Sequence, residues 1–116
     1  MSLGELERQV MDIHWSTLDR DLTVREVADR FPDHAYTTIM TVMTRLAAKG
    51  FLVESKRGRL NVYRARAPRE DYITSLIMDA LSIAPDRDAV LTRFAEGLTQ
   101  GDVTFFRRLF SRRSPS

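Results

Sequence analysis

The chain has 116 residues, of which 18 are basic and 16 acidic, and it contains no cysteine. This length allows one domain, or a small domain with an appendage, and a chain of this size buries roughly two thirds of its unfolded surface. Without cysteine, disulfide frameworks, thiolate metal sites and thiol catalysis are excluded.

The basic residues are concentrated in one part of the chain. Residues 36–69 contain eight Lys or Arg and one acidic residue, Glu54, whereas residues 1–35 and 70–106 are acidic. Positive charge gathered on one segment is what binding to a polyanion requires. No apolar run approaches the ~20 residues of a membrane-spanning helix, and the N-terminus does not resemble a signal peptide. We therefore expect a cytoplasmic protein with no membrane insertion.

The first expected element is an amphipathic helix over residues 3–17. Leu6 and Val10 recur at helical spacing on its apolar face, and Trp15 is expected to anchor the core. We interpret His14 as a residue on the surface of this helix.

A second and a third helix are expected to follow closely. Thr23 and Glu26 have the form of a capping box at the start of a short helix that Pro32 ends. The next helix, over residues 36–49, would end at Gly50 in a left-handed conformation. Its inward residues would be Ile39, Val42, Met43 and Leu46, and its outward ones Thr37, Thr38, Thr41, Thr44 and Arg45. Threonine is a mediocre helix former, so four outward threonines suggest contact with a partner.

A two-stranded hairpin is expected after this helix. Residues 51–53 and 60–65 are strand-like, and Gly58 lies in the turn between them. The basic residues at its tip are Lys56, Arg57 and Arg59. Helix, turn, helix and basic hairpin, in this order, indicate a winged helix-turn-helix domain over residues 1–68.

Three more helices are expected within residues 69–110, and they carry more apolar surface than they can cover by packing on one another. We therefore expect a helical dimerisation region. Its candidate contact residues are Tyr72, Ile73, Leu76, Ile77, Leu81, Val90, Leu91, Phe94, Phe106, Leu109 and Phe110. Residues 111–116 have no apolar residue to dock and are expected to be disordered. The fold class is thus mainly α with a small β-hairpin wing.

Double-stranded DNA is the partner that this pattern favours. The second helix of a helix-turn-helix lies in the major groove, where short hydroxyl side chains contact phosphates or bases. The candidate residues of the recognition helix are Thr37, Thr38, Met40, Thr41, Thr44, Arg45 and Lys49, and those of the wing are Lys56, Arg57 and Arg59. Arg45 would bind guanine or, as we favour, a phosphate.

Other readings of the same residues remain open. The threonine hydroxyls could bond back to backbone carbonyls on a solvated face, and the basic tip could simply discourage edge pairing of the hairpin. A winged-helix protein-interaction module is the alternative function. His14 and His34 have no ligand partner at metal-binding spacing, and no catalytic motif occurs. We expect no enzyme, no metal and no cofactor.

Two blocks of the sequence carry a resemblance to a known family. The first reads LxxLExxVMxxxW and the second AYTTIMTVMTRLAAKGFL, the second being the more specific. With them the chain resembles the penicillinase-repressor (BlaI/MecI/CopY) family of bacterial winged-helix repressors over essentially its whole length. The resemblance implies a homodimer that binds dyad operators with TACA/TGTA-type cores and blocks transcription.

The resemblance also implies how repression is relieved. In that family a transmembrane sensor-protease detects the antibiotic, and an Asn-Phe bond of the repressor's dimerisation arm is cleaved. The matching bond here is Arg93-Phe94, with Arg in place of Asn. The copper-responsive branch carries a C-terminal cysteine cluster that this chain lacks, which excludes copper sensing by that mechanism. Some relatives have Arg where this chain has Met40, so its operator preference is expected to differ from theirs. The target genes are β-lactam resistance genes or others.

Overall fold

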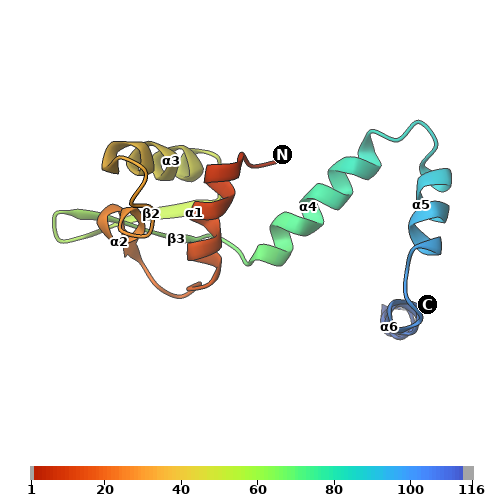
Figure 1. The fold of residues 1–116 in the computed structure, drawn as a ribbon. Coiled ribbons are helices and arrows are strands. Elements are labelled where there is room, and N and C mark those ends of the chain that lie inside the picture. Colours follow the sequence, from red (N-terminus) through yellow and green to blue (C-terminus); the bar gives the residue numbers. More distant parts are fainter. Residues whose placement is uncertain (1, 114–116) are drawn as a thin grey trace. The chain divides into compact units, whose positions relative to one another are not determined.

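The computed structural model describes residues 2–113, and the fold is mainly α with a small antiparallel sheet, as predicted. The chain divides into two compact units between Ile77 and Met78, and Figure 1 shows its helices and strands. The elements are α1 (Glu5–Trp15), β1 (Leu22–Thr23), α2 (Val24–Ala28), α3 (Tyr36–Ala48), β2 (Leu52–Arg57), β3 (Leu60–Ala65), α4 (Arg69–Ser82), α5 (Arg87–Glu96) and α6 (Gln100–Arg113).

The sheet has three strands, in the order β1-β3-β2, whereas the sequence predicted only the β2–β3 hairpin. β2 and β3 pair from Leu52 opposite Ala65 to Arg57 opposite Leu60, and the turn contains Gly58 at a φ of 64°. The hairpin is the predicted wing. β1 was missed because two residues are too short to show the alternation by which a strand is recognised.

The core of the first unit forms around α3. Its four predicted inward residues are all buried, and α1, α2 and the sheet pack against it. Trp15 is 7% exposed, which confirms its predicted place in the core. α3 ends at Ala48, and Gly50 shortly after it has the predicted left-handed conformation, with a φ of 88° that glycine adopts without strain. The sequence therefore determines which face of α3 points inward.

The short helix α2 begins at the predicted capping box. The backbone N–H of Glu26 donates to the hydroxyl of Thr23 at 3.1 Å, and the N–H of Thr23 donates to the Glu26 carboxylate at 2.8 Å. This second bond is the main reason why the pKa of Glu26 is lowered. Thr23 also ends β1, so one residue joins the third strand to the helix-turn-helix.

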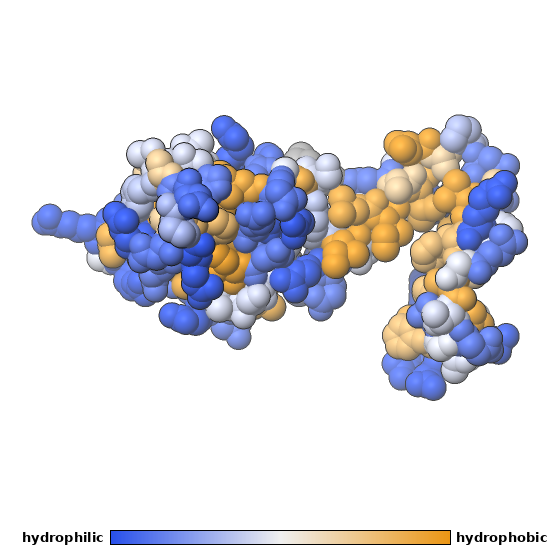
Figure 2. Space-filling model, in the orientation of Figure 1, coloured by the Kyte–Doolittle hydropathy of each residue, from blue (hydrophilic) through white to orange (hydrophobic). Residues whose placement is uncertain are grey.

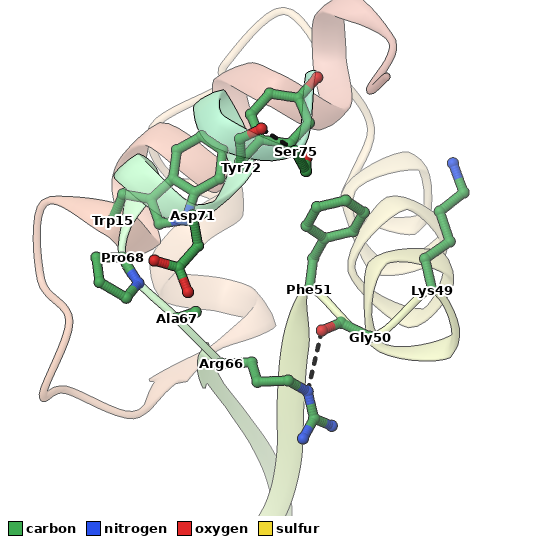
Figure 3. A pocket seen from close by; sticks show the side chains of 10 residues that line it. All are labelled: Trp15, Lys49, Gly50, Phe51, Arg66, Ala67, Pro68, Asp71, Tyr72 and Ser75. Carbon is green, nitrogen blue, oxygen red and sulfur yellow. Dashed lines mark hydrogen bonds between the residues drawn. The ribbon is translucent and has the colours of Figure 1, made fainter. Parts of the chain in front are cut away.

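The first turns of α4 belong to the first unit. Tyr72 stacks on Trp15 with ring centroids 5.5 Å apart and meets Phe51 edge-on, and its hydroxyl accepts a bond of 2.7 Å from the N–H of Leu3. A cleft of about 300 Å³ beside these rings is drawn in Figure 3. Tyr72, expected at a dimer interface, is thus a core residue that fixes the start of α4.

The second unit, beginning at Met78, consists of the end of α4 with α5 and α6. The side chain of Asp86 caps α5 by accepting from the N–H of Ala89, and Phe106 stacks on Phe110 in α6. α6 continues to Arg113, so three residues that were expected to be disordered are helical, and residues 114–116 lie outside the described part of the chain.

His14 lies in the core and not on the helix surface, which corrects the expectation from the sequence. It is fully buried, and neither ring nitrogen has a hydrogen-bond partner in the described residues. It follows Val10 by four residues and so shares that residue's inward face. Burial penalises the charged imidazole and lowers the pKa of His14 to about 4.

This burial predicts a loss of stability in mild acid. The unfolded imidazole takes up a proton near its ordinary pKa of 6.5, but the folded one does so only near 4, so protons favour the unfolded chain as the pH falls through this window. We expect the free energy of unfolding to fall by on the order of 2 kcal/mol between pH 7 and 5. Urea unfolding at each pH, followed by the fluorescence of Trp15, the only tryptophan, measures this free energy.

In a His14→Leu variant, this dependence of the free energy of unfolding on pH should disappear. A His34→Gln variant is the matched control, because His34 is exposed, and it should keep the wild-type dependence. An equal slope in His14→Leu and wild type would contradict the assignment.

Candidate nucleic-acid interface

The outward face of α3 carries the predicted threonines. All four are exposed, and their hydroxyls divide into two kinds. The hydroxyl of Thr44 donates to the backbone carbonyl of Met40 at 2.8 Å, which is the solvated-face arrangement. In residues 2–113 the hydroxyls of the other three, Thr37, Thr38 and Thr41, make no hydrogen bond within the chain, and they are free to bind a partner.

Two grooves flank this ridge of threonines. On one side, a depression of about 600 Å³ lies between α3 and the start of α1. It is lined by Gly4, Leu6, Glu7, Thr37, Thr38, Thr41, Val42, Arg45 and Lys49. On the other side, a groove of about 390 Å³ lies between α3 and the sheet. Its lining includes Arg25, Tyr36, Met40, Thr44, Arg59 and Asn61. The ridge is therefore accessible along both flanks.

Lys49, a predicted DNA contact, is held by the protein itself. Its ammonium lies 2.8 Å from the carboxylate of Glu7 in α1, and the two side chains are 29% and 12% exposed. The hydrogen bond from Lys49, followed by that from the N–H of Gly4, lowers the pKa of Glu7. The structure thus uses Lys49 to join the end of α3 to the start of α1.

Two more cations of the basic segment serve the fold. Arg66 donates to the carbonyl of Gly50 at 3.0 Å (Figure 3), which ties the end of β3 to the turn after α3. Arg69 lies 3.4 Å from the carboxylate of Asp12, with its guanidinium 5.5 Å from the centre of the Trp15 ring. The count of eight basic residues therefore overstates the charge that is available to a partner.

The cations of the wing and of α3 are mostly free. Within the described residues, Arg45, Lys56, Arg59 and Arg64 make no ion pair, and all are exposed. Arg57 lies 3.8 Å from the carboxylate of Glu26, but both side chains are largely exposed, so this pair is weak. Free cations thus lie on the wing and beside the threonine ridge of α3.

Glu54 is the one acidic residue of the basic segment, and it lines the groove between α3 and the sheet. Its carboxylate accepts a hydrogen bond of 2.8 Å from the hydroxyl of Tyr63. Burial, and then this bond, raises the pKa of Tyr63, whose ring is part of the core. The acid therefore has a structural partner within the unit.

The sequence predictions missed Arg25 and Tyr36 as residues of this surface. The guanidinium of Arg25 in α2 lies 4.5 Å above the centre of the Tyr36 ring at the start of α3. Arg25 lies outside the basic segment of residues 36–69, and no local pattern pairs it with Tyr36, so the sequence carried no signal for this contact.

Residues 2–113 bring together no cluster of three or more His, Cys, Asp or Glu side chains that could hold a metal ion. In the same part of the chain, no helix has both the length and the apolar character needed to cross a membrane.

The chain is similar to a known family of proteins and to a transcriptional regulator. The sequence profile of the penicillinase repressor family matches residues 3–112. The chain is 38% identical over 112 residues to the transcriptional regulator BlaI of Mycobacterium tuberculosis, and the match covers 91% of this chain and 80% of that protein.

Two solved structures have a similar fold. The solution structure of the DNA binding domain of the repressor BlaI has a TM-score of 0.52 and 28% identity. The match covers 61% of this chain and 88% of the chain in that structure. A MarR family protein from Bacillus stearothermophilus has a TM-score of 0.51 over 97% of this chain and 73% of its own. Its identity is 17%, so this second likeness concerns the fold alone.

The ion pair of Lys49 with Glu7 is expected to stabilise the first unit. Lys49→Met and Glu7→Gln should each lower the free energy of unfolding by about 1 kcal/mol, and the double variant should lose clearly less than the sum. Arg8→Gln, which removes only exposed pairs on α1, is the control and should change stability little. Additive losses in urea unfolding would show that the pair contributes no coupling.

Proposed function

The chain belongs to the penicillinase repressor family, and from this premise we propose that it represses transcription by binding double-stranded DNA. The observation that supports this most is the combination, in one unit, of a free threonine ridge on α3 and unpaired cations on the neighbouring wing. Such a protein would work in the cytoplasm, where the DNA is.

In the proposed complex α3 enters the major groove. Thr37, Thr38 and Thr41 have hydroxyls that can donate to or accept from bases and phosphates, and their methyl groups can touch the thymine methyl. Arg45 follows one turn after Thr41, where it would bind a phosphate. Lys56 and Arg59 on the wing would hold the neighbouring backbone, since a wing lies beside the groove that the helix occupies.

We further propose that the chain acts as a homodimer on a dyad operator. Figure 2 shows hydrophobic side chains gathered along α4, with others on α5 and α6. Large apolar side chains exposed there are Ile73, Ile77, Met78, Ile83, Val90, Leu91, Phe94, Phe105 and Phe110. Exposed apolar surface of this extent is typical of an interaction site. A symmetric dimer would present two recognition helices to two half-sites of the operator.

The relief of repression is proposed to act on the same region. Arg93 and Phe94 are exposed in α5, so a protease could reach the bond once the helix unwinds. Control of β-lactam resistance genes rests on the family alone. Mass spectrometry of the repressor from cells exposed to a β-lactam tests both points, and an intact chain would contradict proteolytic relief at Arg93-Phe94.

The alternative is a winged-helix module that binds a protein through its wing and C-terminal helices. The exposed apolar residues support this alternative as well. Nuclease footprinting on the upstream region of the gene separates the two functions. The repressor should give a symmetric protected dyad, and the module should give no protection.

The recognition helix can be tested by truncating two side chains. Thr41→Ala or Arg45→Ala should cost about 1 to 3 kcal/mol of operator binding if the residue reads a base, and should relax specificity at that position. An equal loss on operator and random duplexes would mark the residue as a backbone contact. If both variants bound like wild type, α3 would not be the reading helix.

The dimer can be tested on α5. Leu91→Asp with Phe94→Asp should give a monomer in sedimentation, because burying two carboxylates in an apolar interface costs several kcal/mol. Thr92→Asp, which changes a neighbouring exposed residue away from the apolar face, is the control and should remain dimeric. A dimeric double variant would exclude this face of α5.

A further inference from the structure

We propose that Arg25 binds the DNA backbone and that the ring of Tyr36 holds it in position. This assignment rests on the proposed function and extends the DNA-binding surface to α2, from which no contact residue was predicted. The ligand is a phosphodiester oxygen, whose charge and geometry a guanidinium matches.

Arg25 is the second of the five residues of α2, and its side chain is exposed. An exposed cationic side chain loses conformational entropy when it binds an anion unless a contact already restricts it.

Tyr36 supplies that contact without neutralising the charge. The guanidinium carbon lies 4.5 Å above the ring centre, within the range of a cation–π interaction. Among residues 2–113, Arg25 has no carboxylate within ion-pair distance. A guanidinium that stacks on a ring uses its face and keeps the N–H donors of its edge, so Arg25 remains able to bind an anion.

The stacked pair lies on the surface that the proposed function uses. Arg25 and Tyr36 line the same groove as Met40 on α3 and Arg59 on the wing. The acid of this groove, Glu54, is occupied by the hydroxyl of Tyr63 and does not pair with Arg25. Since the ring already restricts the guanidinium, less conformational entropy is lost when the phosphate binds.

The test measures binding of the full chain to an operator duplex and to a random duplex across a salt series. Arg25→Gln should weaken binding to both duplexes by about fivefold per protomer at 0.15 M salt. It should also reduce the slope of the logarithm of the binding constant against the logarithm of the salt concentration by about 0.9 per protomer. Arg30→Gln, the same change at an exposed residue in the turn after α2 and outside this groove, is the control and should leave the slope unchanged.

Two variants of Tyr36 test the positioning role. Tyr36→Phe keeps the ring and should bind like wild type. Tyr36→Leu keeps the charge of Arg25 but removes its support, so it should weaken binding by about two- to tenfold with the slope unchanged.

The outcomes separate this inference from the function on which it rests. Wild-type slope and affinity in Arg25→Gln would overturn the role of Arg25 while leaving the repressor intact. Weaker binding with an unchanged slope, together with a lower urea midpoint, would show a structural role only and would also overturn it. Failure of the wild-type chain to bind either duplex would refute the proposed function itself.

Discussion

The burial of one apolar stripe on α3 is the constraint on which the first unit depends. Ile39, Met43 and Leu46 have no exposed surface, so the helix cannot rotate about its axis without exposing them. Fixing the inward face also fixes the outward one, which carries threonine hydroxyls. The arrangement of the candidate interface is therefore a consequence of core packing, and the three free hydroxyls are presented by a rigid element.

Contacts within the fold hold part of the basic side chains. Lys49 pairs with an acid of α1, Arg66 binds a backbone carbonyl, and Arg69 lies between an acid and an indole ring. These three cations join segments that are distant in sequence, and so they stabilise the first unit. The cations that make no ion pair in the described residues are grouped on the wing and on α3, and Arg25 lies over the ring of Tyr36 in the adjoining groove.

Much of the fold could be predicted because its signals are local. The capping box at Thr23, the glycine that ends α3 and the hairpin turn at Gly58 each act within a few residues. The errors concern residues whose state depends on distant partners. His14 was expected to be exposed because it is polar, although its spacing from Val10 places it inward. Tyr72 was expected to belong to a separate region, although its ring completes an aromatic cluster with Trp15 and Phe51.

The sequence by itself determined the order of the elements, the inward stripe of α3 and the family, because periodicity, turn residues and motifs are properties of neighbouring residues. Only the tertiary structure decided which cations are free, that β1 adds a third strand, and that Arg25 lies over Tyr36. Lys49 is 42 residues from Glu7, and Tyr72 is 69 residues from Leu3. Contacts over such separations depend on how the helices pack, which no local pattern records.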